Sequence, residues 1–124
     1  ILDTSGSISD QDIADFFVEI NKIYKEGHKI HVVESDCAIA KTWDYKGDLP
    51  EVVTGRGGTD FDPGLEYANE YRKQSVVVYF TDGYASSPRV ECKSKIIWCI
   101  SRGGINQPLQ NCPGNFVYLD NVKQ

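Results

Sequence analysis

The chain has 124 residues, 40% hydrophobic and 25% charged, a composition typical of one soluble globular domain with a single core. Its formal net charge of -5 argues against nucleic acid as a partner, because phosphate binding requires a positive surface. We also expect no membrane partner, since no apolar run is long enough to cross a bilayer and no signal-peptide pattern is present.

The first residues carry the most informative pattern of the chain. The apolar pair Ile1-Leu2 leads into Asp3, and two hydroxyl residues, Ser5 and Ser7, follow at alternate positions. Carboxylate and hydroxyl oxygens are hard ligands that suit Mg²⁺ or Mn²⁺ better than zinc. A central strand usually has about 5 or 6 residues, so we expect residues 1–124 to be one domain that lacks upstream residues of a longer polypeptide.

A helix is predicted over residues 10–25. Ser9 is a favourable N-cap, and Asp10 and Asp12 place negative charge in the first turn, where the helix dipole favours it. Gly27 is a stop signal. One apolar stripe recurs at helical spacing and predicts the core-facing side: Ile13, Phe16, Phe17, Ile20, Ile23 and Tyr24.

A hairpin follows the helix. Residues 29–34 and 38–45 read as two strands, and the short turn between them leaves no room for a crossover helix, so the pair is predicted to be antiparallel. Residues 46–58 contain several glycines and a proline, which predicts a loop.

The second half of the chain alternates between helix and strand. Asp62 as a capping residue and Pro63 as the first helical residue predict a helix whose buried face carries Leu65, Ala68 and Tyr71. Continuous apolar runs predict strands covered on both faces, and a shorter strand comes last; the three ranges are 75–80, 95–100 and 116–119. The fold class is therefore α/β, a mostly parallel sheet with one antiparallel edge strand and helices on both faces.

Three polar turns are predicted to meet at one edge of this sheet. In doubly wound sheets, ligands bind beyond the carboxyl ends of the strands where the strand order reverses. Asp3, Ser5 and Ser7 follow the first strand, Asp82 follows strand 75–80, and Thr59 lies in a loop that must return to the same edge. The three hydroxyls can bind Mg²⁺ directly, and the two aspartates can act through water. An Asp or Glu carboxylate of a partner protein would be the natural last ligand.

These motifs resemble those of a known family. Asp3-Thr4-Ser5-Gly6-Ser7, Gly58-Thr59 and Thr81-Asp82-Gly83 are similar to the metal ion-dependent adhesion site of von Willebrand factor type A (VWA) domains. Residues 57–63 and 78–84 look closer still to the VWA-like domain of bacterial predicted metal-dependent peptidases. The resemblance implies a Rossmann-like sheet ordered 3-2-1-4-5-6 and a cytoplasmic protein with a protein partner, and we expect the chain itself to be a binding module rather than an enzyme. It also implies a metal site made of Asp3, Ser5, Ser7, Thr59 and Asp82.

Two other function classes stay open. A Mg²⁺-dependent hydrolase or phosphotransferase needs a general base, but His28 and His31 start the second strand, roughly 15–20 Å from the metal edge at about 3.3 Å per residue. Asp36 or Asp60 would have to serve instead. The third class is a structural domain whose site stays unoccupied.

The cysteines and aromatic residues give weaker indications. No two cysteines are spaced as C-x-x-C, so we expect reduced thiols in a cytoplasmic protein; the alternative is a Cys92–Cys112 disulfide in an exported one. Trp43, Tyr45 and Tyr84 are candidates for gripping a partner at the metal rim, and scattered surface positions are the alternative.

Overall fold

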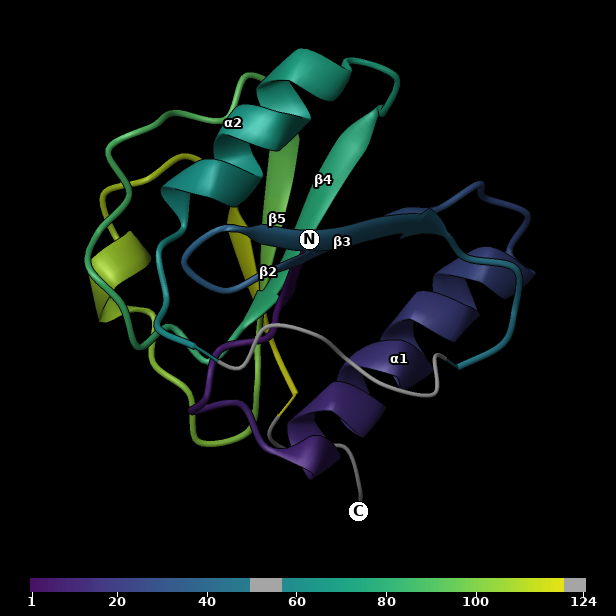
Figure 1. Ribbon diagram of the computed structural model, residues 1–124, viewed down its shortest axis with the longest axis horizontal. Coiled ribbons are helices and arrows are strands. Elements are labelled where there is room, and N and C mark those ends of the chain that lie inside the picture. Colours follow the sequence, from purple (N-terminus) through teal and green to yellow (C-terminus); the bar gives the residue numbers. More distant parts are fainter. Residues whose placement is uncertain (50–56, 120–124) are drawn as a thin grey trace.

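The computed structural model describes residues 1–49 and 57–119, and the rest of the predicted loop 46–58 and the last five residues lie outside this part. One sheet in the order β3-β2-β1-β4-β5-β6 carries all six strands (Figure 1). The elements in chain order are β1 (Leu2–Asp3), α1 (Asp10–Lys25), β2 (His31–Ser35), β3 (Ile39–Asp44), α2 (Asp62–Tyr71), β4 (Val76–Thr81), β5 (Lys95–Ile100), the 3₁₀ turn η1 (Gln107–Leu109) and β6 (Asn115–Tyr118).

The strand pairing confirms the predicted fold class. β2 and β3 pair antiparallel, and every other pair of neighbouring strands is parallel. β1 lies between β2 and β4, so the strand order reverses beside it. The sheet therefore has its switch point where β1 and β4 end, and Asp3 is the last residue of β1.

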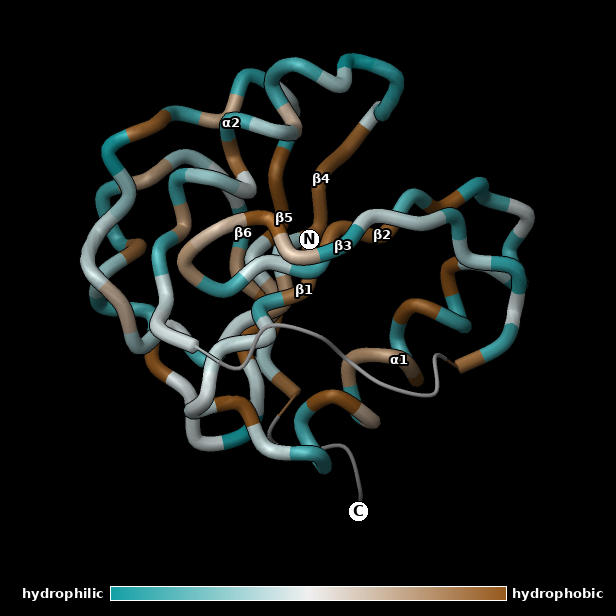
Figure 2. Tube along the Cα trace, viewed as in Figure 1, coloured by the Kyte–Doolittle hydropathy of each residue, from teal (hydrophilic) through white to brown (hydrophobic). Residues whose placement is uncertain are grey.

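The two helices cover opposite faces of the sheet (Figure 1). Phe16, Phe17 and Ile20 of α1 pack against a core that includes Leu2 and Phe80. Leu65 and Ala68 of α2 pack against a second core built on Tyr79 and Trp98. The central strands β4 and β5 therefore bury side chains on both faces, which explains their continuous apolar sequence (Figure 2).

The first helix begins and ends as predicted. Its N-cap is Ser9, whose side chain accepts a hydrogen bond from Asp12 N, while Asp12 Oδ2 accepts one from Ser9 N. This reciprocal capping box satisfies backbone groups that the first helical turn leaves free.

Several local predictions were wrong. The N-cap of α2 is Phe61 rather than Asp62, which is already helical and turns its carboxylate to another loop. Tyr45 is 3% exposed and belongs to the α1 core, so it grips no partner at a rim. Trp43 is half-buried, stacks on Phe17 and donates a hydrogen bond to Glu34. Trp43 in β3 and Tyr45 directly after it alternate with the exposed residues Thr42 and Asp44, and both turn toward the α1 core.

His31 lies at the end of β2 away from the carboxyl edge, as predicted, and has a structural role. It opens β2, at the end of the strand opposite to Ser35. Its Nδ1 lies 2.7 Å from Asp44 Oδ1, its Nε2 lies 2.8 Å from Tyr67 Oη, and its ring stacks on Tyr71 at 4.5 Å. Hydrogen bonding and stacking therefore hold α2 against the hairpin through this imidazole.

All four cysteines are free thiols, so the structure contains no Cys92–Cys112 bridge. The stretch 86–91 is a loop without a helix, and η1 is the helical turn between β5 and β6.

Candidate functional site

Asp3 is the centre of the carboxyl edge of the sheet. It is fully buried, its Oδ1 accepts a hydrogen bond from Ser5 N at 2.9 Å, and its Oδ2 accepts one from Thr81 Oγ1 at 2.6 Å. One carboxylate thus fixes the turn after β1 and ties it to the end of β4. Burial raises the pKa of Asp3, hydrogen bonds from Thr81 and Ser5 oppose the rise, and the charge of Asp82 adds to it.

The turn after Asp3 brings the two predicted serine ligands together. Ser5 Oγ and Ser7 Oγ lie 3.4 Å apart, with Ser5 buried and Ser7 exposed. Ser5 O accepts a hydrogen bond from Ile8 N, and the Ile8 side chain is fully buried in the α1 core. The buried side chain of Ile8 therefore anchors the turn that carries both hydroxyls.

The loop that carries Thr59 reaches the same edge. Gly6 N donates to Gly57 O at 2.8 Å, and Gly57 N donates to Asp36 Oδ2 at 2.9 Å. Asp60 N donates to Asp36 O at 3.1 Å. The backbone on both sides of Thr59 is thus bound to the ends of β1 and β2. None of the described hydrogen bonds involves the Thr59 side chain itself, which is half-buried.

Asp82 completes the set at the end of β4. Its side chain is 5% exposed, and its Oδ1 accepts a hydrogen bond from Tyr84 N at 3.1 Å. Asp82 O accepts one from Ile105 N at 2.9 Å, which joins this turn to the loop after β5. Tyr84 is 53% exposed beside Asp82, in agreement with a place at the rim.

Thr81 is a site residue whose role the sequence analysis missed. Its hydroxyl donates to Asp3 and accepts from Gly83 N, so it connects the two acidic turns. The sequence did contain an indication of this role. Side chains alternate along a strand, so Thr81 lies on the same face as Tyr79, and Asp3 also turns toward that face.

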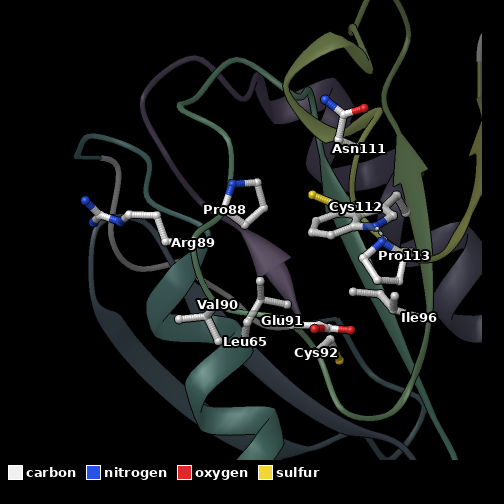
Figure 3. A pocket seen from close by; sticks show the side chains of 11 residues that line it. Leu65, Pro88, Arg89, Val90, Glu91, Cys92, Ile96, Asn111, Cys112 and Pro113 are labelled. Carbon is white, nitrogen blue, oxygen red and sulfur yellow. Dashed lines mark hydrogen bonds between the residues drawn. The ribbon is translucent and has the colours of Figure 1, made fainter.

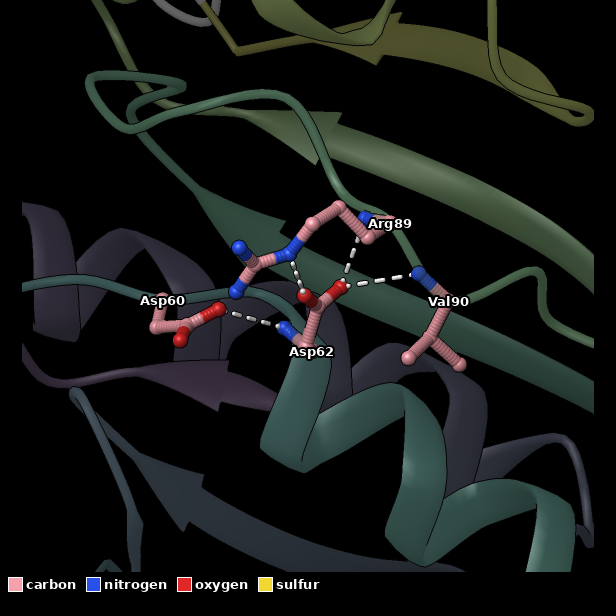
Figure 4. Close-up of polar contacts among 4 residues, drawn as sticks. All are labelled: Asp60, Asp62, Arg89 and Val90. Carbon is pink, nitrogen blue, oxygen red and sulfur yellow. Dashed lines mark hydrogen bonds and ion pairs between the residues drawn. The ribbon is translucent and has the colours of Figure 1, made fainter.

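A second carboxylate anchors the segment beside the Thr59 loop (Figure 4). Asp62 Oδ1 accepts hydrogen bonds from Arg89 N at 2.8 Å and Val90 N at 3.0 Å, and Oδ2 accepts one from Arg89 Nε at 3.2 Å. Asp60 Oδ1 accepts from Asp62 N. Burial alone would raise the pKa of Asp62, but the hydrogen bonds from Val90 and Arg89 outweigh it and hold the pKa below its usual value.

The donor set of this edge fits a hard cation. It offers hydroxyl oxygens beside two carboxylates, which is the chemistry of Mg²⁺ or Mn²⁺ sites. Across residues 1–49 and 57–119, no lysine, arginine or histidine forms an ion pair with Asp3 or Asp82. The same residues contain no cluster of three or more His, Cys, Asp or Glu placed to hold a metal, so any site here depends on hydroxyl oxygens.

A cavity of about 310 Å³ lies elsewhere, between α2, β5 and the loops before and after β5 (Figure 3). Leu65, Ile96 and Trp98 line it together with Cys92 and Cys112. Burial raises the pKa of both thiols, so they are protonated at neutral pH. None of the five predicted site residues lines this cavity.

Comparisons with known proteins agree with this architecture. Residues 1–113 match the VWA-like domain (DUF2201) family, and the chain belongs to it. An uncharacterized protein of Thermotoga maritima is 29% identical over 107 residues, which are 82% of this chain and 26% of that protein. The chain thus spans about a quarter of the length of this curated relative. No solved structure matches the chain. No helix of the described residues has the length and apolar character that crossing a membrane requires.

The turn after β4 predicts a large difference between two glycine substitutions. Gly83 has φ +80°, and a Cβ there would lie 1.7 Å from Ile105 O, whereas Gly103 has φ +70° and open space around it. Gly83→Ala should lower the free energy of unfolding by about 3 kcal/mol or more. Gly103→Ala should cost about 1–2 kcal/mol, the strain of a left-handed backbone alone. Urea denaturation measures both; equal costs would contradict the close packing of Gly83 on Ile105.

The contacts of Asp62 predict a pH-dependent loss of stability. Because its pKa is lower in the folded protein, ionised Asp62 stabilises the fold above about pH 4, and this contribution disappears as the pH falls through the folded value. Asp62→Asn should lower the free energy of unfolding by about 1–2 kcal/mol at pH 7. The difference from the wild type should be smaller at pH 3 than at pH 7.

The matched control is Asp48→Asn, at an exposed loop position. Urea denaturation at pH 7 and pH 3 should show almost no change for it. If Asp62→Asn lowers the free energy of unfolding by the same amount at both pH values, the ionised carboxylate does not contribute to stability.

Proposed function

We propose that this domain is a divalent-metal-dependent protein-binding module. In this proposal Ser5, Ser7 and Thr59 bind Mg²⁺ or Mn²⁺ directly, and Asp3 and Asp82 act through water. An Asp or Glu carboxylate of a partner protein supplies the remaining ligand. The metal would serve as a positively charged bridge between the hydroxyls of this domain and the acidic partner.

The observation that carries this proposal is that two buried carboxylates share the carboxyl edge and pair with no basic side chain of residues 1–49 and 57–119. Asp3 is fully buried and Asp82 is nearly so, and burial, with a smaller contribution from the charge of Asp82, raises the pKa of Asp3. No basic side chain of the described residues pairs with either one. A bound divalent cation would offset two carboxylates that the fold otherwise holds together at a cost in free energy.

Binding is favoured over catalysis because the candidate bases have other roles. Asp36 accepts hydrogen bonds from Gly57 N and Ala38 N, and Asp60 accepts one from Asp62 N. Burial would raise the pKa of Asp36, but these backbone hydrogen bonds outweigh it and lower the pKa, which makes the carboxylate a weak base. His31 is bound to Asp44 and Tyr67 at the other end of β2.

The surroundings of the domain belong to the same proposal. We place it in the cytoplasm, in agreement with four free thiols, as part of a longer protein of the predicted-peptidase type. The 124 residues contain no H-E-x-x-H motif, so a peptidase activity of such a protein would reside in other parts of it.

Metal titration tests the site. Chelator-treated protein should melt several degrees higher when Mg²⁺ or Mn²⁺ is added, because a ligand at 100 times its Kd adds about 2.7 kcal/mol to the free energy of unfolding. Ser5→Ala and Asp3→Asn should lose this shift, and Ser75→Ala, which changes an exposed serine before β4, should keep it. No shift for the wild type at millimolar metal would favour a purely structural domain.

The partner chemistry is then tested with acidic peptides. In the presence of Mn²⁺, immobilised wild-type domain should retain Asp- or Glu-containing peptides and lose them when chelator is added or when the acid is replaced by its amide. Retention that survives chelator would contradict the metal bridge. Turnover of a generic phosphoester that requires metal and Ser5 would favour the hydrolase instead.

A further inference from the structure

A row of polar residues lies one step beyond the paired strands. Leu2 pairs with Phe80, and Thr81 pairs with Ile100. Continuing this register by one or two residues places Thr4, Asp82 and Ser101 side by side on β1, β4 and β5. Hydrogen bonds continue the sheet there, from Thr4 N to Ser35 O and from Ser101 N to Thr81 O. Neighbouring strands lie about 4.8 Å apart, so Asp82 stands between two hydroxyl residues.

The three residues share one face of the sheet. Leu2, Phe80 and Cys99 belong to the α1 core, and side chains two positions further along a strand point to the same face. Asp3 and Thr81, which are bonded to each other, occupy the alternate positions on the α2 face. Thr4 and Ser101 therefore approach the candidate site from the α1 side.

Both hydroxyls are buried without a hydrogen-bond partner. Thr4 is 0% exposed and Ser101 is 3% exposed, and neither Thr4 Oγ1 nor Ser101 Oγ has a partner within residues 1–49 and 57–119. Two further buried side-chain atoms of the described residues lack a hydrogen bond, but their side chains have other polar contacts. Asp15 lies 3.2 Å from Arg102, and the Gln74 amide nitrogen donates to Ala68 O. Buried hydroxyls are almost always hydrogen-bonded, so this pair calls for a partner.

The carboxylate of Asp82 can supply an acceptor oxygen for the hydroxyls of Thr4 and Ser101. Its Oδ1 accepts from Tyr84 N, and no described hydrogen bond uses its Oδ2. Two arginines near Asp82 and Ser101 in sequence have other partners: Arg89 is paired with Asp62, and Arg102 with Asp15. A carboxylate that must stay ionised beside Asp3 gains from hydroxyl donors on both sides, because donors stabilise the charged form.

We propose that Thr4 and Ser101 are positioning residues for Asp82, and that their hydroxyls donate to this carboxylate when the site holds its divalent cation. The inference rests on the proposed metal binding. It adds two residues that would orient the Asp82 carboxylate, which in that proposal acts on the cation through a bound water molecule. Neither hydroxyl has a partner within the described residues, so in this proposal both lower the stability of the metal-free protein.

Mn²⁺ binding and metal-free stability together test this inference. Thr4→Val and Ser101→Ala should bind Mn²⁺ about tenfold more weakly, as is common when partners of metal-bound groups are removed. Their chelator-treated forms should melt at the same temperature as the wild type or higher, because each loses an unsatisfied hydroxyl. Thr4→Ser should restore the wild-type affinity. The matched controls, Thr42→Val on β3 and Ser75→Ala, change exposed hydroxyls and should alter neither quantity.

The outcomes separate the two proposals. If the wild type binds Mn²⁺ and both variants bind it equally well, the positioning role is wrong and the metal site stands. If the variants melt lower without metal and bind Mn²⁺ unchanged, the hydroxyls hold a structural water, and the inference is again wrong. If titration calorimetry detects no Mn²⁺ binding by the wild type, both the proposed function and this inference are wrong.

Discussion

The site depends on one short connection between two strands, the buried carboxylate of Asp3. It receives the Ser5 amide on one oxygen and the Thr81 hydroxyl on the other, so the turn after β1 and the turn after β4 are positioned by a single group. β1 has only two residues in the sheet, and its carboxyl end needs such a tie. The pairing of β1 with β4 brings the two turns to one edge, and the Asp3–Thr81 contact joins them there through their side chains.

The rest of the edge is arranged around this tie. Asp36 holds the Thr59 loop from the end of β2, and Asp62 holds the segment at Arg89 and Val90. These two carboxylates resemble each other, because each is satisfied by backbone N–H groups and has a lowered pKa despite partial burial. Asp3 differs from both, since burial and the charge of Asp82 raise its pKa. The outer carboxylates thus support loops, while the inner pair concentrates negative charge.

Sequence patterns predicted the elements well and the details of side-chain placement poorly. Apolar periodicity and the Ser9 capping box specify α1 locally, and the uninterrupted apolar runs of β4 and β5 show burial on both faces. The position of Asp62 depends on Arg89 and Val90, which are 27 and 28 residues away, so local capping rules assigned it wrongly. The burial of Tyr45 likewise depends on α1 packing over the start of the hairpin, with Tyr24 against it, which no short-range pattern encodes.

The distribution of unfavourable features over the molecule argues for function at this edge. At the opposite end of the sheet, His31 has partners for both ring nitrogens, Asp44 and Tyr67. At the carboxyl edge, residues 1–49 and 57–119 combine a buried carboxylate that pairs with none of their basic side chains, two hydroxyls at Thr4 and Ser101 that find no partner among them, and a left-handed glycine pressed on Ile105. Natural sequences keep such conflicts mainly where function requires them. A ligand that satisfies the carboxylates and the hydroxyls together would resolve most of them at once, and a hard divalent cation with its waters has that chemistry.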